Sequence, residues 1–195
     1  ITSRNGLINK SINSIFLIML PAMTGLIVLA HPIIDVVYAR MSFTTEDVFN
    51  TEIALQMYTI GLLFFSFLNV FSRVFHSEKD MRTPVKGAFL GLVTNIVFNL
   101  ILIKPRGHSG IALASGIAAA VNCIYLYGKL RAYKYQFYEY AGLLVKVSFA
   151  CVLMGAVTYV SYISGMHILA VIPMGAFIYF FSLRITGVNI RKVLR

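Results

Sequence analysis

Four polar side chains recur at helical spacing within one apolar stretch of the sequence, and they are Thr59, Ser66, Asn69 and Arg73. At 100° per residue they fall within about 80° of one another, so one helix would carry them as a polar stripe. Polar groups at membrane depth usually face protein or a watery cavity. Two interpretations stay open: hydrogen bonding between helices, or the lining of a cavity in which Arg73 meets an anionic headgroup.

A second group of polar side chains consists of amides and a hydroxyl. Asn95 and Asn99 are four residues apart, and Ser115 and Asn122 are seven apart in the next apolar run, so each pair shares one helix face. Oxygens of Asn95, Asn99 and Ser115 are able to ligate a small cation between two helices. Hydrogen bonding that holds the helices together is the alternative. No carboxylate accompanies them, so the candidate is a monovalent cation site, and we expect no metal centre.

The stretch "SEKDMRTPVKG" (residues 77–87) is the most charged part of the chain. Asp80 with Thr83 and Pro84 predicts a fixed turn that starts a helix. Lys79, Arg82 and Lys86 have two open roles: they contact phosphates of the inner leaflet, or they only anchor the topology of the chain.

Motifs of catalysis are missing from the sequence. We find no phosphate-binding glycine loop, no HExxH, no GxSxG and no CxxC pair. We therefore expect a protein that is not an enzyme and that uses no cofactor. The net charge of +10 does not indicate nucleic-acid binding, because the basic residues lie at the ends of apolar runs.

Composition identifies the elements that must carry these residues. Of 195 residues, 58% are hydrophobic and only 12% are charged, whereas a soluble domain is about a quarter charged. The sequence therefore predicts an all-α, polytopic membrane protein. Six transmembrane helices are expected, at residues 11–37 (with kinks at Pro21 and Pro32), 51–75, 84–103, 110–129, 140–162 and 167–183.

The basic residues predict the orientation of these helices. Fourteen of the 17 Lys and Arg residues belong to one set of ends and connections, and the other set has only Arg40, Lys104 and Arg106. Because Lys and Arg collect on the cytoplasmic side, we expect both termini and the 76–86 loop to be cytoplasmic. On the outer side, Thr44 and Asp47 have capping-box spacing, so the second helix is expected to begin well outside the membrane.

Small residues predict where the helices approach closely. Gly87 and Gly91 form a GxxxG spacing, and the run 110–120 is rich in Gly, Ala and Ser. The last two spans carry few small polar residues and are expected to face lipid.

The chain resembles the MurJ/MviN lipid II flippases of the MOP exporter superfamily. The similarity follows "LPAMTGLIVLAHPIIDVVY", "ALQMYTIGL", "VFHSEKDMRTPVKGAFLGLVTNIVFNLILI" and "GHSGIALASGIAAAVNCIYLYGKLR" in order. The most specific block is residues 75–86, in which the D-x-[KR]-T-P-V-K core is intact at residues 80–86. The last two spans match by position and hydropathy more than by motif.

This resemblance implies a MATE-like transporter of fourteen helices, of which this chain corresponds to the last six. Residues 1–135 would form the last four helices of the second lobe, and residues 136–195 the final lipid-facing pair with a cytoplasmic tail. The implied function is to move lipid II, an undecaprenyl-pyrophosphate-linked peptidoglycan precursor, from the inner to the outer leaflet by alternating access. The implied partners are lipid II, membrane lipids and the preceding helices, in the bacterial inner membrane.

Two alternatives stay open at this point: another exporter of the superfamily, carrying an oligosaccharide-lipid or a drug, and a membrane scaffold or truncated relic that transports nothing. The energy source is also open among membrane potential, sodium and protons.

Overall fold

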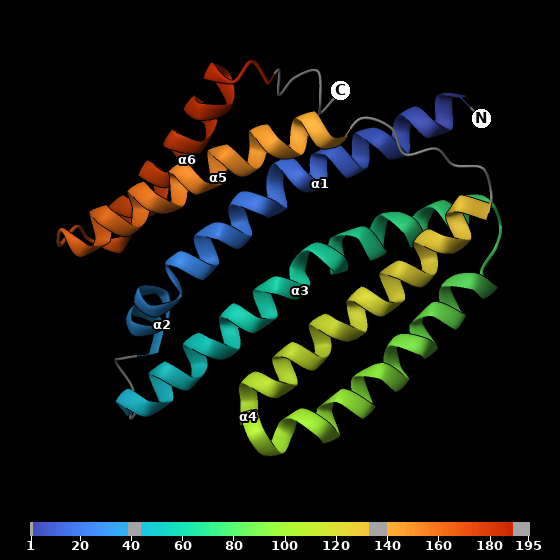
Figure 1. Ribbon diagram of the computed structural model, residues 1–195, viewed down its shortest axis with the longest axis horizontal. Coiled ribbons are helices and arrows are strands. Elements are labelled where there is room, and N and C mark those ends of the chain that lie inside the picture. Colours follow the sequence, from blue (N-terminus) through green and yellow to red (C-terminus); the bar gives the residue numbers. More distant parts are fainter. Residues whose placement is uncertain (1, 39–43, 133–139, 189–195) are drawn as a thin grey trace.

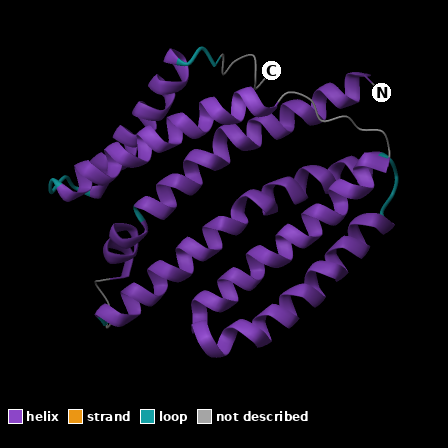
Figure 2. Ribbon diagram, viewed as in Figure 1, coloured by secondary structure: helices purple, strands orange, loops and turns teal. Residues whose placement is uncertain are grey.

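The computed structural model describes residues 2–38, 44–132 and 140–188, and these ranges contain helices and short turns (Figures 1 and 2). The helices are α1 (Thr2–Val28), α2 (Ala30–Tyr38), α3 (Thr45–Ser77), α4 (Arg82–Ala132), α5 (Tyr140–Ile163) and α6 (Ile168–Ile185). Over the described residues, five helices are long and apolar enough to cross a membrane: α1, α3, α4, α5 and α6.

Helix α4 contains two of the six expected spans. Its backbone is helical except at Gly107, where φ is 54° and ψ is −130°. A positive φ is easily adopted by glycine, which has no Cβ. The chain folds back there, so that the limb before Gly107 and the limb after it form a hairpin (Figure 1). The two limbs match the spans expected at 84–103 and 110–129.

The first span differs from its prediction as a single kinked helix over 11–37. It begins already at Thr2, and it is broken between α1 and α2 at Leu29. Pro32 accounts for the position of the break, because a proline lacks the N–H that would bond the carbonyl four residues earlier, and its ring clashes with that carbonyl. The carbonyl in question belongs to Val28, the last residue of α1. Pro21 lies inside α1, which continues past it.

The start of α3 confirms the predicted capping box. The Thr44 hydroxyl accepts a hydrogen bond from the Asp47 backbone N–H, and the Asp47 carboxylate accepts one from the Thr44 backbone N–H. Hydrogen bonds from the Thr44 side chain and backbone hold the pKa of the Asp47 carboxyl below its ordinary value. This polar first turn precedes the apolar part of the helix, and α3 begins at Thr45, before the span expected from residue 51.

The charged stretch forms the turn between α3 and α4. Lys79 has a φ of 59°, and the Asp80 N–H bonds the Phe75 carbonyl while the Lys79 N–H bonds the His76 carbonyl. This is a Schellman ending, with lysine at the position that glycine usually occupies. The Asp80 carboxylate then accepts from the backbone N–H groups of Arg82 and Thr83, both at 3.0 Å. The expected turn is therefore present, and α4 begins two residues before Pro84.

Helix α1 is the central element of the packing, since apolar clusters flank it on two sides. One cluster joins it to α3 and the second limb of α4 through Ile8, Ile12, Phe71, Phe75, Leu126 and Leu130. The other joins it to α5 and α6 through Leu17, Val147, Met154, Tyr179 and Leu183. Figure 1 shows α5 and α6 on one side of α1 and the α3–α4 unit on the other.

Glycines allow the closest helix contacts. A Cβ added to Gly61 of α3 would lie 2.8 Å from the Cα of Gly116 in the second limb of α4, so the two backbones touch. Within the α4 hairpin, Gly87 and Gly91 both pack against Asn122. The GxxxG spacing and the small residues of the fourth span therefore have the close contacts that the sequence predicts. Lipid tails are as apolar as leucine, so such packing is what holds membrane helices together.

Candidate functional site

The polar stripe of α3 changes in exposure along the helix. Thr59 is only 1% exposed, Ser66 is half-buried, and Asn69 and Arg73 are exposed. Thr59, Ser66 and Asn69 each donate a hydrogen bond to the carbonyl four residues earlier, at 2.7, 3.0 and 3.0 Å. Only the end of the stripe near Ser77 is therefore exposed, and Thr59 is buried within the described chain.

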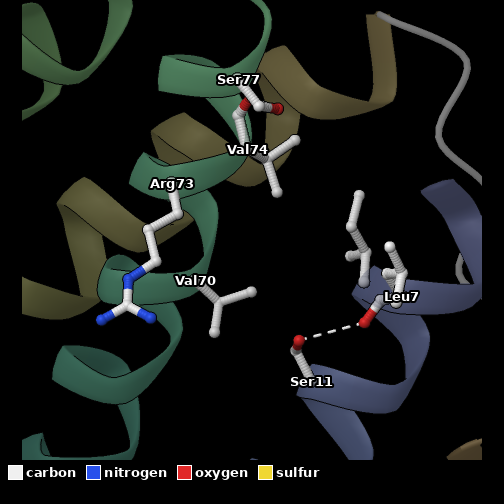
Figure 3. Close-up of a pocket in the computed structure, with 7 residues that line it drawn as sticks. Leu7, Ser11, Val70, Arg73, Val74 and Ser77 are labelled. Atoms are coloured by element: carbon white, nitrogen blue, oxygen red, sulfur yellow. Dashed lines mark hydrogen bonds between the residues drawn. The ribbon is translucent and has the colours of Figure 1, made fainter.

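Arg73 stands beside a crevice of about 230 Å³ between α1 and α3. Its other lining residues are Leu7, Ile8, Ser11, Val70, Val74 and Ser77. In Figure 3, Val70 and Val74 point toward α1, while the guanidinium of Arg73 turns along α3 and away from Ser11. In the described ranges no acidic side chain lies within ion-pair distance of Arg73. The crevice is thus mainly apolar, and Arg73 is the cationic residue among those that line it.

The three residues of the candidate cation site come together between the limbs of α4. The Asn95 side-chain N–H donates to the Ser115 hydroxyl at 3.2 Å, and the Asn99 N–H donates to the Asn95 Oδ1 at 2.9 Å. The Asn99 Oδ1 is buried and has no hydrogen-bond partner within the described chain. An unpartnered buried oxygen costs free energy, so this atom is the best candidate ligand in the group. Among the described residues, no cluster of three His, Cys, Asp or Glu side chains is placed to hold a metal.

A larger, almost wholly apolar groove lies between α1, α2, α5 and α6. Its volume is about 670 Å³, and its walls include Ile18, Leu26, Ile33, Ile172 and Phe180. The sequence indicated that the last two spans face lipid, but it did not predict that α1 and α2 form walls of a groove with them, because these segments are about 150 residues apart. Leu169, at 72% exposed, and Val152, at 70%, agree with a lipid-facing outer surface of α5 and α6.

Two polar residues form a contact beside the break between α1 and α2. The sequence did not single them out. The His31 Nδ1 lies 2.9 Å from the Glu52 Oε2 of α3. Gln56 donates to the Glu52 Oε1 at 3.3 Å. The sequence did not indicate that His31 pairs with Glu52, because 21 positions separate them and no periodic pattern relates them.

The basic ends of the helices gather at one end of the molecule. The start of α1, the end of α3 and both ends of α4 lie together, whereas α2, the start of α3 and the Gly107 turn lie at the opposite end (Figure 1). Lys79, Arg82 and Lys86 are exposed at the first of these ends. The fold therefore separates the two sets of connections in space.

Comparisons with known proteins agree with the geometry. The sequence model of the family described as "Lipid II flippase MurJ" matches residues 2–186. A probable lipid II flippase MurJ of Haemophilus influenzae is 34% identical over 147 residues, which are 74% of this chain and 29% of that protein. A probable lipid II flippase MurJ of Thermotoga maritima is 31% identical over 186 residues, which are 93% of this chain and 38% of that protein.

A solved structure extends the likeness to three dimensions. The chain is similar to "Lipid II flippase MurJ, inward closed conformation", with a TM-score of 0.83 and 27% identity over 98% of this chain and 40% of that one. The chain thus spans at most about two fifths of the length of these relatives. The match supports the expected all-helical membrane-transporter fold.

Proposed function

Because the chain belongs to the family of MurJ lipid II flippases, we propose that it forms part of the path along which lipid II moves from the inner to the outer leaflet by alternating access. One observation carries this proposal: the same chain has exposed polar residues, Asn69 and Arg73, on α3 and, at a separate place, an apolar groove of about 670 Å³. Lipid II combines an anionic headgroup with a long apolar tail. A transported lipid is released unchanged, so this function requires no catalytic residue.

The two parts of the chain take different roles in this proposal. Residues 1–135 belong to the second lobe and bring Ser66, Asn69 and Arg73 to the headgroup. Residues 136–195 contain the final pair, and α5 and α6 with α1 and α2 hold the tail in the apolar groove. The contact of the second apolar cluster with α1 supports this arrangement, because it joins the final pair to the lobe.

We place the cation of the transport cycle, if transport uses one, at Asn95, Asn99 and Ser115. The buried and unpartnered Asn99 Oδ1 supports this assignment. The site has only neutral oxygens, which suit a monovalent cation better than a divalent one. Lys79, Arg82 and Lys86 at the α3–α4 turn contact phosphates of the cytoplasmic leaflet.

The proposed setting is the bacterial plasma membrane, with both termini and the α3–α4 turn in the cytoplasm and with the preceding helices of the transporter as partners. We expect an impermeant maleimide, added to intact cells, to label a Glu46→Cys variant and to spare Ser77→Cys. Both positions are exposed. The background should lack Cys123 and Cys151, which are both buried. Labelling of Ser77→Cys alone would reverse the proposed orientation.

Protection by substrate tests the proposed function itself. In membranes that hold the chain together with the other helices of a family flippase, we expect Asn69→Cys to react with a small polar thiol reagent. The reaction should slow severalfold when lipid II accumulates, because bound ligands bury most of their contact surface. Glu46→Cys is the control, since Glu46 is exposed in the polar first turn of α3, before the expected span, and its reaction rate should not change with lipid II. Equal reaction rates at Asn69→Cys with and without lipid II would contradict the proposal.

A further inference from the structure

Pro21 leaves one carbonyl in the middle of α1 without a donor from its own helix. A helical proline has no N–H, so the carbonyl four residues before it has no partner in the helix. That carbonyl belongs to Leu17, whose side chain is 3% exposed. In a lipid environment water does not replace the missing donor, so a neighbouring helix must supply one. Membrane helices tolerate proline where this condition is met.

The donor comes from α6. The Tyr179 hydroxyl donates to the Leu17 carbonyl oxygen at 2.6 Å, across 162 positions of sequence. Tyr179 is itself 3% exposed and lies in the apolar cluster that joins α1, α5 and α6. Pro21 therefore leaves a buried carbonyl without a helical donor, and the Tyr179 hydroxyl supplies that donor.

A second contact fixes the same face of α6. Gly175 lies one turn before Tyr179, and a Cβ added to Gly175 would lie 2.5 Å from the methyl group of Thr158 in α5. Thr158 is 2% exposed and donates to the Met154 carbonyl. Helix α6 is thus held against α5 through Gly175 and against α1 through Tyr179.

The two contacts lie on the wall of the apolar groove. Leu17, Pro21, Thr158, Gly175 and Tyr179 all line it. We propose that Tyr179 is a positioning residue, whose bond to the carbonyl freed by Pro21 fixes α6 against α1 and sets the width of the groove. The role of the groove as the site of the lipid tail rests on the proposed function, whereas the bond itself does not.

A double-mutant cycle tests the bond without reference to transport. Tyr179→Phe removes the donor, and Pro21→Ala restores a helical N–H to the Leu17 carbonyl. In detergent, we expect Tyr179→Phe to lower the melting temperature of the chain by about 4 °C, because a buried carbonyl loses its partner. In the Pro21→Ala background, the same change should lower it by less than about 1 °C. Tyr159→Phe, at a 55% exposed position of α5, should change nothing. Equal effects of Tyr179→Phe in both backgrounds would overturn the proposal.

A photoactivatable undecaprenyl phosphate tests the consequence for the groove. We expect the probe to cross-link to the wild-type chain, Tyr179→Phe to lose most of this cross-linking, and Pro21→Ala to restore part of it in the double variant. A Tyr179→Phe yield equal to wild type would overturn the role of the bond in shaping the groove. If the wild-type chain itself gave no cross-link, the tail site of the proposed function would fall, and the melting cycle would still decide whether the bond positions α6.

Discussion

Replacing Gly61 by leucine is expected to lower the free energy of unfolding by about 3 kcal/mol, the upper part of the range for overpacked sites. The first atom of any side chain at this position would lie 2.8 Å from the Gly116 Cα. The obstacle is backbone, which has no rotamer to change, so α3 and the second limb of α4 must separate. Contacts of Phe71 and Phe75 with Leu126 and Leu130 in the same interface would be weakened as well.

Unfolding of the purified chain in mixed micelles, followed by circular dichroism, measures this loss. Gly128→Ala is the matched control, because Gly128 lies in the same limb of α4 and a Cβ there meets nothing within 4 Å. Alanine is the better helix former by at most about 1 kcal/mol, so the control should be neutral or slightly stabilising. A Gly61→Leu variant as stable as the control would show that the α3–α4 contact is not a tight one.

The parts of this fold that the sequence predicted are those set by local chemistry. The capping box of Thr44 and Asp47, the turn at Asp80 and the apolar spans each depend on residues within a few positions of one another. Their physical cause is contained in a short window, so spacing is sufficient. The break at Leu29 was missed although Pro32 was noted as a kink, because a single proline does not tell whether a helix bends or ends.

The features that the sequence did not predict depend on pairs far apart in the chain. Gly61 is one glycine among 14, and its importance appears only when Gly116 faces it. The acceptor that Pro21 leaves at Leu17 was deducible, but the choice of Tyr179 among 11 tyrosines was not. The four residues of the polar stripe lie on one helix, α3, as their spacing predicts. The helices packed around α3 decide that Thr59 is buried and that Arg73 is exposed.

The exposed polar groups of α3 lead to the second large effect, which concerns the chain as a unit. Asn69 and Arg73 are exposed on a membrane helix, and polar groups at membrane depth usually face protein or a watery cavity. These side chains therefore need a watery cavity or further helices beside them. The relatives supply a reason to expect further helices, since the chain covers 29% and 38% of the two compared above.

We therefore expect the chain alone to restore no growth to cells depleted of their lipid II flippase, and the chain expressed with the preceding helices of the family to restore it. Colony counts measure the effect, and immunoblots of the membrane fraction must show equal amounts of the chain in both strains. With the preceding helices present, Arg73→Ala is expected to reduce rescue strongly, because the variant loses the cation that we propose faces the headgroup, whereas Arg73→Lys retains the charge and should rescue in part. Growth restored by the chain alone would mean that copies of these six spans enclose a complete path by associating with one another, which would contradict the proposed need for further helices.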